Sequence, residues 1–318
     1  QEMIESSGDA WSYMLDRLAA FNERILSKQE QLPSPSELRG TLTNPAIFEE
    51  LPEGLKVVAD ATVAERARLL GVRTAEMHIA LASSQSLPEF IPEEFSLHYQ
   101  RSLFSGFQSL VRATFQNQVR TLRKLPEEVR KEAEEVLMMK DDILAAFKRI
   151  YRKKFDTMKT RIHGDYHLGQ VLFTGKDFII LDFEGEPARS YSERRLKRSP
   201  LRDVAGMIRS FHYAAYGSLF LNDQIRDDDR RRLLPFVEQW YHYMSGFFMQ
   251  AYLETANGYD FIPAEREDLD TMLQTYILEK AIYELNYELN NRPDWMIIPI
   301  RGIKAIVTKA KNEKLIRV

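Results

Sequence analysis

Helical patterning gives way to strand-like patterning only once in this 318-residue chain, and that single change most constrains its fold. Apolar residues recur at helical spacing in residues 11–25 and in long segments on both sides of the middle. From Thr160 the pattern changes to two short apolar runs, 170–173 and 178–183, separated by turn-type residues. We therefore expect a mainly α (α+β) fold, a helical bundle with one central β-hairpin.

The expected helices are bounded mainly by proline and acidic residues. Pro92 and Pro126 are each followed by two glutamates, which is typical of a helix start because proline lacks the N–H group that stays unpaired there. Pro33, Pro35 and Pro45 predict an extended linker that runs to about residue 52. The expected helices are 11–25, 61–82, 92–122, 126–155, 201–221, 228–255, 264–291 and 300–311.

Charge and cysteine content exclude several classes of protein. Lys and Arg number 44 and Asp and Glu 47, so the net charge of −3 disfavours a general nucleic-acid or membrane-surface binder. The absence of cysteine excludes disulfides, cysteine-ligated zinc and a cysteine nucleophile. The longest stretch without a charged residue, 239–253, is shorter than the ~20 apolar residues of a membrane span. We expect a cytoplasmic protein that binds neither nucleic acid nor membrane.

The hairpin segment carries the side chains best suited to chemistry. Asp165 lies in a loop, Gln170 is expected to open the first strand, and Asp182 and Glu184 to end the second on one face. Oxygen ligands in an incomplete cage suit magnesium, which retains waters and phosphate oxygens. Phosphoryl transfer needs that metal together with a carboxylate beside the acceptor hydroxyl. The spacing therefore indicates a phosphotransferase site.

Simpler interpretations of the same residues stay open. Asp182 and Glu184 alone could be the exposed end of a strand. His163 and His167 have a zinc-ligand spacing, but it requires a helix, and the strand that follows argues against one. The segment 193–198, with four basic residues, is either solvated and salt-bridged or a segment that contacts phosphates.

Taken together, the motifs resemble those of the maltokinases, members of the aminoglycoside-phosphotransferase and protein-kinase-like superfamily. The resemblance covers the chain from about residue 7 to its end, and it implies a protein-kinase-like C-terminal lobe. The segments that carry it are 71–78, 163–170, 181–187, 192–211 and 283–299.

The resemblance also implies roles for individual residues. Asp165 would be the catalytic base on the acceptor hydroxyl, and His163 would support its loop from behind. Asp203 would hydrogen-bond the catalytic loop, although an ordinary acid at a helix start is the alternative. The side chains implied to hold magnesium and the phosphates of ATP are Gln170, Asp182 and Glu184.

On the sugar side, the resemblance implies that one C-terminal segment lines a maltose pocket. Sugars bind forked hydrogen-bonding groups and flat aromatic faces, and this segment supplies both, although its aromatic residues could equally be core contacts. The residues implied are Lys280, Tyr283, Glu284, Tyr287, Arg292 and Trp295. The activity implied is ATP-dependent phosphorylation of maltose to maltose 1-phosphate. Two alternatives remain: another acceptor such as glucosamine or an aminoglycoside, and a non-catalytic sugar-binding or docking module of a trehalose synthase.

The N-terminal nucleotide lobe of such kinases is expected to be largely absent. The chain has no Gly-x-Gly pair and no run of strands before Thr160. We expect residues 1–55 to be a helical connection and linker, and 56–318 the helical lobe with its catalytic hairpin at 160–187. Because Gln1 is not a methionine, we expect a C-terminal part of a longer polypeptide that is poorly active alone. The resemblance implies a fused or associated trehalose synthase domain as its partner.

Overall fold

The computed structural model describes residues 5–27, 38–84, 86–220, 222 and 225–316. The chain forms two compact units, the first from Gln1–Glu93 and Lys159–Ile262, the second from Glu94–Met158 and Pro263–Val318. The two-residue strands β3 (Glu93–Glu94) and β4 (Met158–Lys159) lie where the chain passes from one unit to the other. The expected division separates residues 1–55, as a connection from an N-terminal lobe, from the helical lobe 56–318. This division stays a prediction.

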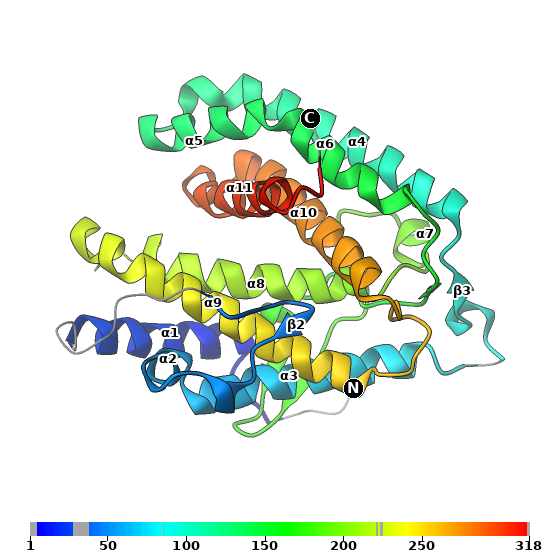
Figure 1. Ribbon diagram of the computed structural model, residues 1–318, viewed down its shortest axis with the longest axis horizontal. Helices are drawn as coiled ribbons and strands as arrows, with labels where there is room; N and C mark the ends of the chain where they lie inside the picture. Colours follow the sequence, from blue (N-terminus) through cyan, green and yellow to red (C-terminus); the bar gives the residue numbers. More distant parts are fainter. Residues whose placement is uncertain (1–4, 28–37, 85, 221, 223–224, 317–318) are drawn as a thin grey trace. The chain divides into compact units, whose positions relative to one another are not determined.

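The first unit is mainly helical (Figure 1) and contains two short antiparallel hairpins, one more than the sequence predicted. Its helices are α1 (Ala10–Ser27), α2 (Glu53–Ala59), α3 (Ala61–Leu81), α7 (Tyr191–Arg194), α8 (Leu201–Phe220) and α9 (Asp227–Thr255). Its short 3-10 turns are η1 (Phe48–Glu50), η2 (Pro88–Phe90) and η5 (Leu168–Gln170). Its other strands are β1 (Gly40–Thr41), β2 (Asn44–Pro45), β5 (Val171–Phe173) and β6 (Phe178–Ile180).

Helices α3 and α9 lie side by side at the base of this unit (Figure 1). Their backbones approach so closely that a Cβ added at Gly71 would lie 2.2 Å from the carbonyl oxygen of Phe248. Only glycine fits such a contact without moving a helix. Helix α8, nearly all of it buried, packs against both α9 and α1. This core forms the platform on which the hairpin and its loops sit.

The predicted β-hairpin is confirmed. Strands β5 and β6 pair antiparallel in the register Val171 with Ile180, Leu172 with Ile179 and Phe173 with Phe178. The turn between them is fastened to α3, because Arg73 donates two hydrogen bonds to the Asp177 carboxylate, at 2.9 and 2.8 Å. Residues 7–9 pair along the free edge of β5, so the hairpin is held from both sides.

The second unit is also helical. Helix α10 packs against α4 and α11, and the stacked rings of Phe107 and Phe147, with centroids 4.6 Å apart, form part of its core. Its helices are α4 (Leu97–Thr121), α5 (Glu127–Met138), α6 (Lys140–Lys148), α10 (Arg266–Asn291) and α11 (Ile297–Asn312). Its 3-10 turns are η3 (Leu122–Lys124), η4 (Arg149–Tyr151) and η6 (Pro293–Trp295).

Two helix predictions are wrong in detail. The helix expected from Pro92 begins only at Leu97, because Ser96 caps it through a 3.2 Å hydrogen bond from the Tyr99 amide to its hydroxyl. The helix expected over 126–155 is broken at Met139, whose ψ of 8° leaves the helical region, and ends as η4. Helices α2 and α7 were not predicted. Part of the predicted linker lies outside the described residues.

No helix among the described residues combines the length and the apolar character that a membrane crossing requires.

Candidate active site

A buried carboxylate holds the loop of residues 163–165, called here the His163 loop. Asp203, near the start of α8, is 3% exposed. Its carboxylate accepts hydrogen bonds from the backbone amides of His163, at 2.7 Å, and Gly164, at 3.0 Å. The prediction that Asp203 hydrogen-bonds this loop is therefore confirmed. The arrangement fixes the backbone on which Asp165 is carried.

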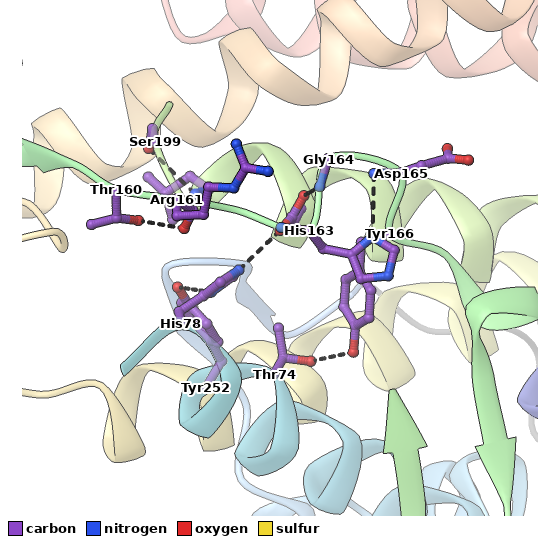
Figure 2. Close-up of polar contacts among 12 residues, drawn as sticks. Thr74, His78, Thr160, Arg161, His163, Gly164, Asp165, Tyr166, Ser199 and Tyr252 are labelled. Carbon is purple, nitrogen blue, oxygen red and sulfur yellow. Dashed lines mark hydrogen bonds and ion pairs between the residues drawn. The ribbon is translucent and has the colours of Figure 1, made fainter. Parts of the chain in front are cut away.

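Two further helices complete the network around Asp203 (Figure 2). The Nε2 atom of His78, on α3, lies 3.1 Å from an Asp203 oxygen, and its Nδ1 atom lies 3.0 Å from the hydroxyl of Tyr252 on α9. A carboxylate only accepts, so Nε2 of His78 donates to Asp203, and the Tyr252 hydroxyl donates to Nδ1 of the same ring. All three side chains are almost fully buried.

Burial alone would raise the pKa of Asp203. The hydrogen bond from His78, the electrostatic effect of His78 and His163, and the bond from the Gly164 amide act in the opposite direction, and the pKa of Asp203 lies below its ordinary value. Asp203 is therefore an ionised carboxylate that only accepts hydrogen bonds.

The imidazole of His163 connects the loop to the second acidic segment. Its Nε2 atom donates to the carbonyl oxygen of Leu181 at 2.7 Å, and its Nδ1 atom accepts from the Asp165 amide at 3.3 Å. The ring lies between those of Tyr166 and Phe183, at centroid distances of 5.3 and 5.1 Å. One buried histidine therefore ties the backbone of Asp165 to the residue just before Asp182.

Helix α8 also supports the other end of the loop. A Cβ added at Gly206 would lie 2.5 Å from the carbonyl oxygen of Tyr166, so the helix and the loop are in direct backbone contact. The hydroxyl of Ser210 accepts from the Leu168 amide at 3.1 Å, and the Tyr166 hydroxyl lies 2.8 Å from that of Thr74. The carboxylate of Asp165 is half-buried and points away from this network (Figure 2).

The segment 182–185, called here the Asp182 loop, differs from the predicted strand end. Gln170 closes η5 instead of opening β5, and β6 ends at Ile180. Asp182 has a φ of 62°, so the alternation expected to put Asp182 and Glu184 on one face does not apply. Both side chains are exposed, and the Gln170 amide donates to Asp182 at 3.1 Å.

The metal-binding capacity of these loops is limited. No group of three or more histidine, aspartate or glutamate side chains that could hold a metal ion occurs among the described residues. The segment from His163 to His167 forms no helix, and Nδ1 of His167 accepts from the Gly169 amide. Gln170, Asp182 and Glu184 still offer hard oxygen atoms, as suits an ion that takes its other ligands from phosphates and water.

The residues predicted to bind sugar lie in the second unit, around the end of α10. Arg292 forms two hydrogen bonds with the buried carboxylate of Glu288, at 2.9 and 2.7 Å, and stacks over the rings of Trp295 and Tyr287. Glu284 is buried, whereas Tyr287 is 46% exposed, so the segment does not present a single solvent-facing side. Lys280 lies over the Tyr283 ring, 5.2 Å from its centroid.

Within the first unit, the structure links His163 to the Asp165 amide and to the carbonyl before Asp182, and it links Gln170 to Asp182. Within the second unit, it brings together Arg292, Trp295 and Tyr287. Sequence reasoning missed His78 and Tyr252. The available signal was a histidine on an apolar helix, which by itself does not identify its partner.

Comparisons with known proteins point in one direction. No protein-family model matches the sequence. A glucosamine kinase from Mycolicibacterium smegmatis is 28% identical over 155 residues, which are 47% of this chain and 35% of that kinase. A glucosamine kinase from Streptacidiphilus jiangxiensis is 24% identical over 140 residues, 43% of this chain and 29% of that protein.

Solved structures of a glucosamine kinase have the same fold. One, in complex with glucosamine, ADP and inorganic phosphate, matches 97% of this chain and 63% of its own with a TM-score of 0.66 at 18% identity. A second crystal form has a TM-score of 0.67 and covers 96% of this chain and 61% of its own. The predicted fold class, a mainly helical kinase-like lobe, is confirmed. The chain spans less than two thirds of each of these proteins.

Proposed function

We propose that this chain is part of an ATP-dependent sugar kinase and carries its catalytic loop. The observation that supports this most directly is the hydrogen-bonded position of His163 between the Asp165 amide and the carbonyl of Leu181. That position keeps a carboxylate suited to be a base next to a second acidic loop. The likeness of the chain to glucosamine kinases supports the same reaction class.

In this proposal, Asp165 accepts the proton of the sugar hydroxyl while the γ-phosphoryl group of ATP passes to its oxygen and ADP leaves. The carboxylate is half-buried on a loop with a fixed backbone, so it needs little reorganisation to reach the acceptor. His163 is a positioning residue, because its ring supports the loop while both of its nitrogen atoms are already hydrogen-bonded.

Magnesium would be held by Asp182 and Glu184 together with the amide oxygen of Gln170. Magnesium is usually bound by one or two carboxylates plus substrate phosphates and water, so two acidic side chains and an amide suffice. When bound, the ion neutralises charge on the phosphates of ATP. The hydrogen bond from Gln170 to Asp182 holds the aspartate side chain and leaves the amide oxygen of Gln170 available.

Two acceptors have separate support. Glucosamine is favoured by the comparisons, since the matched proteins are glucosamine kinases. Maltose is favoured by the motif resemblance, which includes the segments around Asp165 and Trp295. The sugar-binding role of the cluster at the end of α10, where carboxylate, guanidinium and aromatic groups lie together within the second unit, stays a prediction. A cytoplasmic location and a fused or associated trehalose synthase also stay predictions.

An acceptor panel tests the proposal. The gene product that contains this chain is incubated with Mg-ATP and glucosamine, maltose or an aminoglycoside, and products are identified by mass spectrometry. Asp165→Asn is expected to lower kcat by about 10²–10⁴-fold. Asp227→Asn, on the exposed first turn of α9, is the matched control and should keep full activity.

Retained turnover in Asp165→Asn would contradict the assignment of the base. If no acceptor is phosphorylated but maltose raises the melting temperature while Mg-ATP does not, the non-catalytic sugar-binding alternative would replace the kinase.

A further inference from the structure

The basic run, defined here as residues 194–198, lies beside the segment that enters the His163 loop. The backbones of Thr160 and Arg198 exchange two hydrogen bonds, at 2.9 and 2.8 Å. One residue further on, the guanidinium of Arg161 donates to the carbonyl oxygen of Arg194 at 3.0 Å. The sequence alone left open whether this run is salt-bridged or contacts phosphates. The side-chain contacts show which of its residues are held by other groups of the protein.

Two members of the basic run have structural partners. Lys197 donates to the Glu93 carboxylate at 2.7 Å and to the carbonyl of Pro88 at 2.6 Å. Arg194 donates to the carbonyls of Arg189 and Pro187 and lies over the ring of Tyr191. For these two residues the salt-bridged or structural interpretation holds.

Arg161 and Arg195 are different. Neither guanidinium forms an ion pair with a carboxylate in the part of the chain that the structure describes. The nearby Glu193 carboxylate accepts from the amide and the hydroxyl of Ser190, the N-cap residue of α7. Burial lowers the pKa of Arg161, and the like charge of Arg195 lowers it further. The Arg161 guanidinium therefore lies against the peptide bond that joins Arg194 to Arg195, and neither arginine has a carboxylate partner among the described residues.

We propose that Arg161 and Arg195 together bind a phosphate dianion beside the His163 loop. Guanidinium groups match phosphate oxygens in geometry, and two positive charges balance the double negative charge. The hydrogen bond to the Arg194 carbonyl fixes one side of the Arg161 guanidinium. The dianion is that of free inorganic phosphate or of a phosphate ester.

The proposed phosphate site lies next to the Asp182 loop. The Cβ of Arg194 lies 3.5 Å from the position that a Cβ at Gly185 would take, so the basic run touches the Asp182 loop. A bound phosphate would remove the repulsion between the two arginines and so stabilise the segments on either side. The site uses neither Asp165 nor the proposed magnesium ligands and does not depend on the proposed function.

Thermal unfolding of the protein with inorganic phosphate, at constant ionic strength set by chloride, tests this site. Phosphate is expected to raise the melting temperature of the unmodified protein, and Arg195→Gln is expected to weaken its affinity about tenfold. Arg232→Gln, which removes an exposed arginine from the first turns of α9, is the charge-matched control and should respond like the unmodified protein.

Arg195→Glu sharpens the test, since Arg195 is exposed and its replacement should not prevent folding. The new carboxylate is expected to pair with Arg161, raise the melting temperature without phosphate and abolish the phosphate response. Glucose 6-phosphate and ATP, each used in place of phosphate, distinguish an ester or a nucleotide from free phosphate as the source.

The absence of any phosphate-induced shift, or an equal shift in Arg195→Gln, Arg195→Glu and the control, would overturn the site. Because no acceptor or turnover enters the measurement, this result is independent of whether the sugar kinase proposal succeeds.

Discussion

The His163 loop and the Asp182 loop lie next to each other but are held in opposite ways. The His163 loop is anchored by a buried carboxylate that accepts from two of its amides and from His78. The Asp182 loop carries exposed side chains, and the bond from Gln170 to Asp182 is itself exposed. A base needs a fixed position before substrate arrives, whereas metal ligands can be ordered by the ion and the phosphates that they bind.

The backbone conformations of the two loops reinforce the contrast. Asp182 has a φ of 62°, a conformation that costs a non-glycine residue energy and is found where function requires it. In the His163 loop, the positive φ, 89°, falls on Gly164, where it costs little, and Asp203 on α8 accepts from two backbone amides. We call Asp203, His78 and Tyr252, which hold the His163 loop, the anchor. The comparison predicts that substitutions in the anchor lower the free energy of unfolding, whereas substitutions in the Asp182 loop lower activity with little loss of stability.

The largest expected effect is that of Asp203→Asn. The amide cannot accept from all three N–H groups that now surround the carboxylate, so buried donors lose their partners. We expect the free energy of unfolding to fall by about 3 kcal/mol or more in urea titrations.

Asp182→Asn is the isosteric comparison, because asparagine also tolerates a positive φ. It should change the free energy of unfolding by less than about 0.5 kcal/mol while strongly reducing phosphoryl transfer. Equal losses of stability in the two variants would remove the distinction between the loops.

The pH dependence of stability isolates the same anchor. The pKa of Asp203 is lower in the folded protein than its ordinary value, so its contribution is fully present above the unfolded pKa near 4. It is lost as the pH falls through the folded pKa. The difference in unfolding free energy between the unmodified protein and Asp203→Asn should therefore be constant near neutral pH and shrink below about pH 4.

Gly206→Ala is expected to have the next largest effect. The new Cβ would lie 2.5 Å from the carbonyl oxygen of Tyr166, so α8 or the loop must shift, at a cost of about 1–3 kcal/mol. No ionisable group is removed, so this loss should not vary with pH in the way expected for Asp203. Gly258→Ala, where the structure shows open space but φ is 83°, separates the cost of crowding from that of backbone strain.

Local sequence patterns predicted most of the fold because they act through local physics. Apolar periodicity located α1, α3 and α8 within a few residues, and turn chemistry located the hairpin. The break at Met139 was missed because no glycine or proline marks it. The capping serine at Ser96, rather than Pro92, sets the start of α4, and choosing between two such signals requires knowledge of the packing.

The candidate site was predictable to the same extent. Asp165, Gln170 and Asp182 lie in the segments that flank one hairpin, so the contact between Gln170 and Asp182 follows from local structure. Tyr252 and His78 are 174 residues apart in the sequence and meet only because α3 packs against α9. Nothing in one sequence identifies such a pair, and the positive φ of Asp182 likewise emerges only from the folded loop.

Tyr252→Phe tests the outermost bond of the anchor and is expected to have a smaller effect. It removes the hydroxyl that fixes the tautomer of His78 but leaves the packed ring in place. We expect a loss of about 1 kcal/mol in unfolding free energy, since a buried nitrogen loses its donor. Tyr166→Phe, which removes a hydroxyl bonded to Thr74, is the matched control for a lost buried hydroxyl. Only Tyr252→Phe should reduce the extra stability that Asp203 provides, as measured by a double-mutant cycle with Asp203→Asn.

Gln170→Ala should have the smallest effect on stability, within about 0.5 kcal/mol, because the bond it removes is exposed. If Gln170 holds both Asp182 and magnesium, the variant should need more magnesium to reach half of its maximal rate, while its melting temperature stays unchanged. Gln250→Ala, whose amide also donates to a carboxylate, that of Glu254 on α9, should show neither change. A large loss of stability in Gln170→Ala would mean that the Asp182 loop is anchored as firmly as the His163 loop. An unchanged magnesium requirement would remove Gln170 from the set of proposed ligands and leave two carboxylates to hold the ion.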